Sequence, residues 1–216
     1  MAVYTKINTE DIQNIERNFN FGKIISFNGI KKGIENTNYS ILTTKKKYIL
    51  TIFEKRVIAK DLPFFMKLMD GLSNLRIKCP KPIKNKKGEY LFKLKNKNAC
   101  IVTFLKGKDK KKLSNKEIYS VGKNVAKLHS TSKKLKLYRN NSLSLNSWGI
   151  LLNKIDKRIN NLSKNLIKLM QIDLKEIKKN WPKNLPSGII HGDLFIDNIF
   201  FHNKKFYGYI DFYFSA

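Results

Sequence analysis

The sequence predicts an α+β fold that combines an N-terminal antiparallel sheet plus helix with a mainly helical C-terminal part. Three observations support it: strand-like segments separated by turns up to residue 105, helical periodicity from residue 114, and a strand, loop and hairpin pattern at 189–212. The 216 residues suffice for one large or two small domains. A hydrophobic content of 42%, with 14 Phe and 9 Tyr, allows a sizeable core.

Two helical patterns and four strand patterns fill the first 105 residues. A helix begins at residues 9–13 and places Ile12, Ile15 and Phe19 on one face. A second helix is expected at 61–75, with an apolar face made of Leu62, Phe65, Leu68, Met69 and Leu72. The strands are expected at 39–42, 48–53, 90–94 and 99–105.

Two features of this part are suited to a nucleotide. A glycine-bearing turn at 27–39 joins the first strands, and glycine lets backbone N–H groups approach phosphates closely. The same pattern is also typical of an ordinary hairpin. The last strand ends in a linker, where the backbone of Thr103, Phe104 and Leu105 is placed to hydrogen-bond adenine.

Helices dominate the next segment. Ser114 and Glu117 form a capping box that opens a helix with apolar residues at helical spacing up to Leu128. His129 ends that apolar stripe, and we interpret it as structural. A loop is expected at 133–146, followed by a long helical region from Ser147 that breaks near Gln171.

The most informative stretch lies at 189–212. A short apolar strand ends at Ile190, a polar loop runs from His191 to Asp197, and a hairpin at 199–212 turns around residues 202–205. This layout predicts that Asp193, Asn198 and Asp211 meet at one end of a small sheet.

Phosphoryl transfer is the chemistry that needs these three residues. Asp193 can accept the proton of an attacking hydroxyl, while the oxygens of Asn198 and Asp211 are hard ligands of the kind that Mg²⁺ prefers. The strings H-G-D-L-F-I-D-N and I-D-F match the spacing of the protein-kinase catalytic loop and its metal-binding aspartate. The Arg after His and the Gly after Phe of protein kinases are absent.

The string H-G-D-x-x-x-x-N resembles that of the aminoglycoside phosphotransferase and choline kinase group. Further strings resemble bacterial homoserine kinases of the aminoglycoside-phosphotransferase-like type over nearly the whole chain. The more diagnostic ones are Y-I-L-T at 48–51, E-K-R at 54–56, L-P-F-F at 62–65 and I-D-F-Y-F at 210–214; the others are M-A-V-Y-T at 1–5, F-N-G-I at 27–30, G-I-E-N-T-N-Y at 33–39 and I-V-T-F-L at 101–105.

The resemblance implies a protein-kinase-like fold with an N-lobe at 1–105 and a partial C-lobe at 106–216. It also implies ATP- and Mg²⁺-dependent phosphorylation of the homoserine hydroxyl, a step toward threonine. The residue roles it implies are Asp193 as the base, Asn198 and Asp211 as metal ligands, and Gly33, Asn36 and Asn38 as phosphate-loop positions.

Two departures from the family pattern stand out. Thr51 occupies the strand position where relatives carry a phosphate-binding Lys or Arg, which leaves Lys55 and Arg56 as candidates for that cation. The sequence also stops after Ala216, whereas relatives continue with further helices. We therefore expect a C-terminally truncated copy that lacks efficient activity and exposes the apolar strand at 206–214.

Three other functions compete with this interpretation: a kinase for an aminoglycoside- or choline-like substrate, an inactive fragment, and a basic nucleic-acid-binding protein. Lys and Arg number 44 against 16 Asp and Glu, a net charge of +28. Only five of these are Arg, the usual reader of bases, and the Lys residues are spread along the chain among many Asn. This distribution is typical of compositional bias and argues against specific nucleic-acid binding.

Cys79 and Cys100 have neither metal-binding nor redox spacing, and we expect Cys100 to be a buried apolar residue. The N-terminus has no apolar signal core, and no run approaches the length of a membrane span. A cytoplasmic protein without a membrane partner is expected. The sequence does not indicate the oligomeric state.

If the Lys excess is compositional, nucleic-acid affinity should be about micromolar or weaker at physiological salt, without sequence preference. Fluorescence anisotropy with several labelled duplexes measures this. A sequence-selective complex that survives at about 200 mM salt would contradict it.

Overall fold

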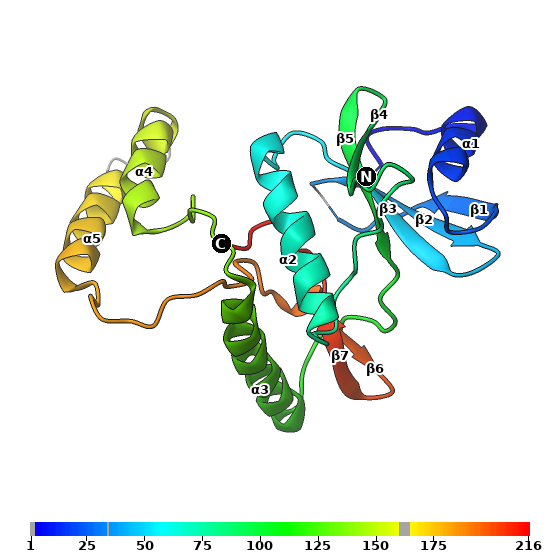
Figure 1. Ribbon diagram of the computed structural model, residues 1–216. Coiled ribbons are helices and arrows are strands. Elements are labelled where there is room, and N and C mark those ends of the chain that lie inside the picture. Colours follow the sequence, from blue (N-terminus) through cyan, green and yellow to red (C-terminus); the bar gives the residue numbers. More distant parts are fainter. Residues whose placement is uncertain (1–2, 34, 160–164) are drawn as a thin grey trace. The chain divides into compact units, whose positions relative to one another are not determined.

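The computed structural model of the protein describes residues 3–33, 35–159 and 165–216 (Figure 1). Met1, Ala2 and Ile34, which belong to two of the family-like strings, lie outside these ranges, as do residues 160–164 of the expected helical region. Two compact units make up the chain. One combines Met1–Arg139 with Ile189–Ala216, and the other is Asn140–Gly188.

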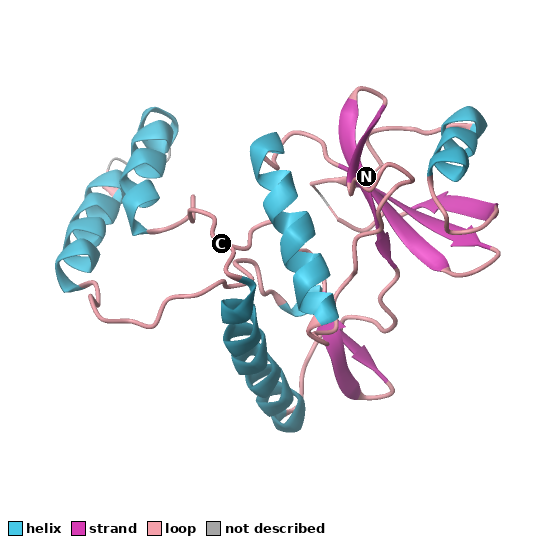
Figure 2. Ribbon diagram, in the orientation of Figure 1, coloured by secondary structure: helices cyan, strands magenta, loops and turns pink. Residues whose placement is uncertain are grey.

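Five antiparallel strands form the main sheet of the first unit, in the order β1-β2-β3-β5-β4 (Figure 2). The strands are β1 (Ile24–Gly29), β2 (Thr37–Thr43), β3 (Lys47–Ile52), β4 (Leu91–Leu94) and β5 (Lys97–Thr103). The predictions of β2 to β5 are confirmed. The strand β1 was missed, because its sequence I-I-S-F-N-G lies at the sheet edge and has no regular alternation of buried and exposed residues.

The two faces of this sheet have different covers, since successive side chains of a strand point to opposite faces. On one face, Leu50 of β3 and Ile101 of β5 lie in a core with Ile12 and Ile15 of the helix α1 (Thr9–Asn18). On the other face, Cys100 and Val102 join the core built around the helix α2.

Both predicted helices of this part are confirmed. The helix α1 is capped by Asn8, whose side-chain oxygen accepts from the backbone N–H of Asp11 at 3.0 Å. The helix α2 (Leu62–Asn74) follows the short helix η1 (Ala59–Asp61) and carries Pro63 in its first turn, where proline is tolerated. Its predicted apolar face is buried throughout: Leu62, Phe65, Leu68, Met69 and Leu72.

The capping box of the helix α3 (Asn115–Ser132) is also confirmed, because the N–H of Ser114 donates to Oε2 of Glu117 at 3.0 Å. Leu128, at the end of its apolar stripe, is buried in the α2 core. The next turn is the short helix η2 (Lys133–Leu135), within the segment that was expected to be a loop.

The hairpin near the end of the chain consists of β6 (Ile199–His202) and β7 (Lys205–Tyr209). Asn203 and Lys204 both have positive φ, the conformation of a tight two-residue turn. The strand β7 ends at Tyr209, before the predicted Phe212, because Asp211 with φ 63° leaves the extended conformation. Tyr209 and Phe212 are both 1% exposed, so the expected loss of cover over 206–214 was wrong for these side chains.

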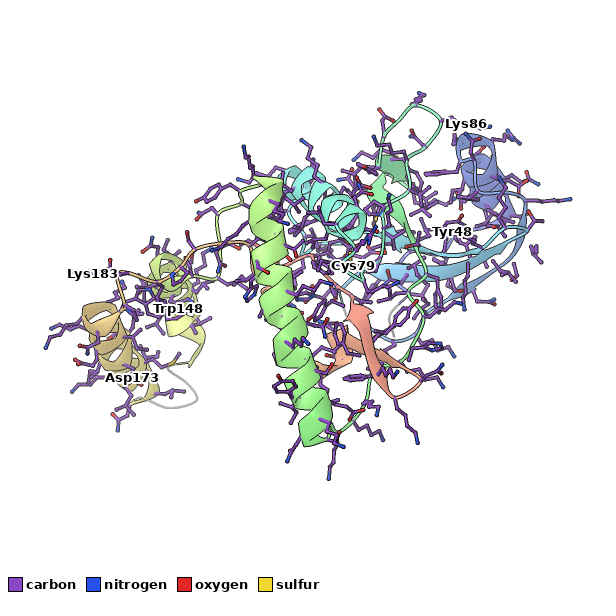
Figure 3. All side chains as sticks on the ribbon, turned by 60° about the horizontal axis from the view of Figure 1, so that its bottom comes forward. Tyr48, Cys79, Lys86, Trp148, Asp173 and Lys183 are labelled. Carbon is purple, nitrogen blue, oxygen red and sulfur yellow. The ribbon has the colours of Figure 1, made fainter. Side chains whose placement is uncertain are left out.

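The second unit is a pair of helices, α4 (Leu145–Ile159) and α5 (Leu166–Asn180). Trp148, labelled in Figure 3, meets Trp181 edge to face with ring centroids 5.7 Å apart. The break expected near Gln171 was wrong, because α5 continues through that residue. No Gly or Pro lies between 151 and 180, so the sequence offered no signal for where one helix ends.

The compact units divide at 139/140 and 188/189, so they do not test the predicted lobe boundary at 105/106, which stays a prediction. None of the helices in the described ranges combines the length and hydropathy needed to cross a bilayer. Cys79 (labelled in Figure 3) and Cys100 are free and buried, and burial raises the pKa of both thiols to about 12.

The glycine substitutions with the clearest expected effects are at Gly192 and Gly122. Gly192 has φ 80°, and a Cβ there would lie 2.4 Å from the carbonyl oxygen of Phe214. We expect Gly192→Ala to lower the free energy of unfolding by at least about 2 kcal/mol, because both the strain and the clash involve backbone.

Gly122→Ala is the matched control, because Gly122 lies in α3 and, apart from the helix's own adjacent residues, no described atom stands within 4 Å of the added Cβ. It should raise the free energy of unfolding by about 0.5–1 kcal/mol through helix propensity. Urea unfolding of both variants measures this. Equal stability of Gly192→Ala and the parent chain would refute the close approach of the loop to Phe214.

Candidate active site

The loop that carries the predicted catalytic residues is fixed by a buried histidine. His191 is 2% exposed, its Nε2 lies 2.8 Å from the carbonyl oxygen of Ile210, and its Nδ1 lies 3.3 Å from the N–H of Asp193. Since the N–H must donate and the carbonyl must accept, the ring is neutral with its proton on Nε2. Burial lowers the pKa of His191, which favours the same neutral state.

Asp193 and Asn198 are brought together as predicted. The side-chain nitrogen of Asn198 donates to the backbone oxygen of Asp193 at 2.9 Å and to its Oδ2 at 3.3 Å. The turn between them is the short helix η3 (Ile196–Asn198). Because the amide nitrogen is engaged by Asp193, the amide oxygen is the atom through which Asn198 can bind a cation.

Asp211 lies in the same electrostatic environment. Burial raises the pKa of its carboxyl to about 6, and the negative charges of Asp193, Glu35 and Asp197 add to the effect. A bond from the N–H of Tyr213 opposes it. A partly buried carboxylate surrounded by other carboxylates is costly to ionise without a cation.

Glu35 and Arg56 also belong to this site, although sequence reasoning gave Glu35 no role. The two side chains form an ion pair, with Arg56 61% and Glu35 20% exposed. Burial raises the pKa of Glu35, Arg56 opposes the rise, and the charge of Asp193 adds to it. The only available signal was that both residues lie in family-like strings, E-N and E-K-R.

The predicted phosphate-loop residues lie between β1 and β2 or at the start of β2. Gly33 has φ 107°, and among the described residues other than its chain neighbours no heavy atom lies within 4 Å of where a Cβ would stand. The side-chain oxygen of Asn36 accepts from the N–H of Glu54 at 3.4 Å, and that of Asn38 accepts from the hydroxyl of Thr51 at 2.7 Å. Both amide oxygens are therefore engaged within the N-terminal sheet.

Two of the three predicted adenine contacts already use their amides. The N–H of Thr103 donates to the carbonyl of Lys81 at 2.9 Å, and that of Phe104 donates to the carbonyl of Lys47 at 3.2 Å. Of their backbone groups, the carbonyl oxygens are therefore the ones left to hydrogen-bond adenine. Leu105 is buried, and its N–H takes part in none of the hydrogen bonds found among the described residues.

Asp193, Asn198 and Asp211 form an all-oxygen donor set. Within the described ranges, no three His, Cys, Asp or Glu side chains are grouped so as to hold a metal ion by themselves. This is compatible with Mg²⁺, which is usually bound by one or two carboxylates together with substrate phosphates. Burial and the neighbouring carboxylates raise the pKa of Asp211, which disfavours its charged form. A bound cation would offset this effect, because it favours the charged carboxylate.

The sheet, the helical part and this donor set together define a kinase-like phosphotransferase. The chain belongs to the phosphotransferase enzyme family, whose pattern matches residues 26–216. It is 39% identical to a homoserine kinase of Agrobacterium fabrum and 38% identical to one of Parvibaculum lavamentivorans. Both matches cover the whole chain and 67% of the relative, so the chain spans about two thirds of their length. The resemblance predicted from the sequence is confirmed.

Solved structures show the same fold. A spectinomycin phosphotransferase, in complex with ADP and spectinomycin, has a TM-score of 0.69 at 15% identity; the match covers 98% of this chain and 70% of that one. An amicoumacin kinase with AMP-PNP and Ca²⁺ has a TM-score of 0.66 at 14% identity, covering 97% and 65%. The predicted kinase-like fold is therefore confirmed.

The raised pKa of Asp211 has a consequence for stability. A carboxyl whose pKa is higher in the folded state stabilises the protein most below its unfolded value of 3.8, and this stability is lost as pH rises to about 6. We therefore expect Asp211→Asn to stabilise the metal-free chain at pH about 7, by up to about 3 kcal/mol. The gain should shrink toward zero at pH about 4.

Urea unfolding in the presence of a chelator measures this difference at both pH values. Glu10→Gln is the control, because Glu10 is exposed in the first turn of α1 and should change stability by about 0.5 kcal/mol or less. A loss of stability in Asp211→Asn at neutral pH would show that the carboxylate is not destabilised by its neighbours.

Proposed function

We propose that the protein transfers the γ-phosphoryl group of ATP to the side-chain hydroxyl of homoserine. The observation that carries this proposal is the similarity to homoserine kinases along the entire chain, at 38–39% identity in the two relatives described above. The hydrogen-bonded pair of Asp193 and Asn198, with Asp211 in the same electrostatic environment, supports phosphoryl transfer as the chemistry.

In this proposal, Asp193 accepts the proton of the homoserine hydroxyl as its oxygen attacks the γ-phosphorus. The bond from phosphorus to the bridging oxygen breaks, and ADP leaves. Asn198 and Asp211 would hold Mg²⁺ through oxygen atoms, and the bound ion would neutralise charge on the phosphates. The neutral His191 holds the backbone of Asp193 and that of Ile210 in place relative to each other through one hydrogen bond to each.

The nucleotide would lie between an N-lobe at 1–105 and a C-lobe at 106–216. We assign its phosphates to the loop around Gly33, Asn36 and Asn38, and its adenine to the backbone of residues 103–105. The open space at Gly33 supports the first assignment. The free ATP that the reaction needs leads us to propose a cytoplasmic location.

An ADP-release assay tests the substrate. The purified chain and a version extended by the remaining third of the Agrobacterium fabrum relative receive homoserine, choline or spectinomycin. We expect ADP release that depends on homoserine. Release with choline or spectinomycin, and none with homoserine in either version, would overturn the substrate while leaving the phosphotransferase class intact.

Asp193→Asn in the active version should lower turnover by about a hundredfold or more, because the base is lost, while affinity for ATP changes little. Asp173→Asn is a suitable control, since that carboxylate is exposed on α5 (Figure 3). Near-normal turnover of Asp193→Asn would remove Asp193 from the mechanism.

A further inference from the structure

The β3 strand offers a nucleotide no cation at the place of the protein-kinase lysine, and its one lysine, Lys47, begins the strand and lies 4.4 Å from the ring centroid of Phe104. Protein kinases carry a lysine on this strand, which contacts the phosphates and pairs with a helix glutamate. Here Thr51 occupies the corresponding place, is 3% exposed, and donates its hydroxyl to Asn38. The helix α2, which follows β3, contains no glutamate.

The site nevertheless needs positive charge. Three carboxylates belong to it, those of Asp193, Asp211 and Glu35, and the Glu35 carboxylate is ion-paired with Arg56. A triphosphate adds several more negative charges. A fixed cation close to the carboxylates would lower the cost of bringing these charges together.

Most nearby cations are engaged elsewhere. The ammonium of Lys32 pairs with Asp109 at 2.6 Å, which directs it to the linker after β5. Lys97 pairs with Glu54 and also donates to the hydroxyl of Thr5 at 2.7 Å, so its ammonium is already engaged by two neighbours.

Arg56 is placed differently. It pairs with Glu35, and its guanidinium lies 5.4 Å from the ring centroid of Phe214. The carbonyl of Phe214 in turn approaches Gly192 of the catalytic loop. Arg56 is thus in contact with two of the segments that build the candidate site.

We propose that Arg56 binds the phosphate groups of the nucleotide and that Glu35 is the internal anion that it leaves when they arrive. The assignment rests on the proposed function. The planar guanidinium suits this exchange, because it can form two parallel hydrogen bonds with either a carboxylate or a phosphate. Since Arg56 is 61% exposed, it can reach a ligand without opening the core.

Calorimetric titration of the 216-residue chain with Mg-ATP and with adenosine tests the proposal. Arg56→Met should weaken Mg-ATP binding by about tenfold or more and leave adenosine binding unchanged, because only the phosphate contact is lost. The affinity of Arg56→Lys for Mg-ATP should fall between that of the parent chain and that of Arg56→Met, since lysine keeps the charge but loses the paired hydrogen bonds.

Glu35→Gln gives the opposite sign. Removing the competing carboxylate should strengthen Mg-ATP binding by about twofold or more, because Arg56 no longer has to leave a charged partner. A structural ion pair would not produce opposite effects in Arg56→Met and Glu35→Gln. Weaker binding in Glu35→Gln would overturn the role of Glu35 as the internal competitor.

Lys55→Met is the matched control, because Lys55 is the neighbouring cation, is exposed, and loses the same charge. Unchanged Mg-ATP affinity in this variant supports Arg56. If Arg56→Met binds Mg-ATP as well as the parent, or if Lys55→Met shows the loss instead, the inference is wrong and the proposed function stands. A parent chain that binds adenosine and Mg-ATP equally weakly would overturn both the role of Arg56 and the proposed function.

Discussion

The arrangement of the candidate site depends on one buried imidazole. His191 joins two segments that are distant in sequence, since it accepts from the backbone of Asp193 and donates to that of Ile210. One segment carries the proposed base and the other leads directly into Asp211. Ser215 strengthens the junction, because its hydroxyl is buried and donates to the carbonyl of His191 at 3.1 Å. The backbone segments that carry the two carboxylates are therefore fixed by hydrogen bonds of His191 and Ser215.

That geometry has an electrostatic cost. Burial raises the pKa of Asp211 and of Glu35 above their ordinary values, the neighbouring carboxylates add to the rise, and Arg56 opposes it at Glu35. The ligand-free site stores unfavourable energy, which a cation and its phosphates can relieve. Affinity for the ligand and stability of the empty protein are opposed at this point of the structure.

Sequence patterns predicted most of the fold, and the errors have identifiable causes. The strands β2 to β5 and the helices α2 and α3 follow clear periodicity, whereas β1 is a short edge strand without alternation. The end of β7 could not be foreseen, since Asp211 takes a positive φ that its residue type only rarely adopts. Asp193 and Asn198 were found together because a single loop fixes their spacing. Glu35 was missed because it approaches Asp211 only through tertiary folding, which spacing along the chain cannot indicate.

The reactivity of the two buried cysteines can report local opening of the structure. Cys100 lies under Tyr213, whose hydroxyl is 3.9 Å from its sulfur, and Cys79 is held against α2 through the carbonyl of Met69 at 3.6 Å. Because burial keeps both thiols protonated, an alkylating reagent can react only after the surrounding structure separates. The labelling rate of Cys100 therefore follows the separation of the Asp211 segment from the sheet, and that of Cys79 follows the loosening of α2. Reagent kinetics at these two sulfurs can distinguish a local fluctuation beside the site from unfolding of the whole unit.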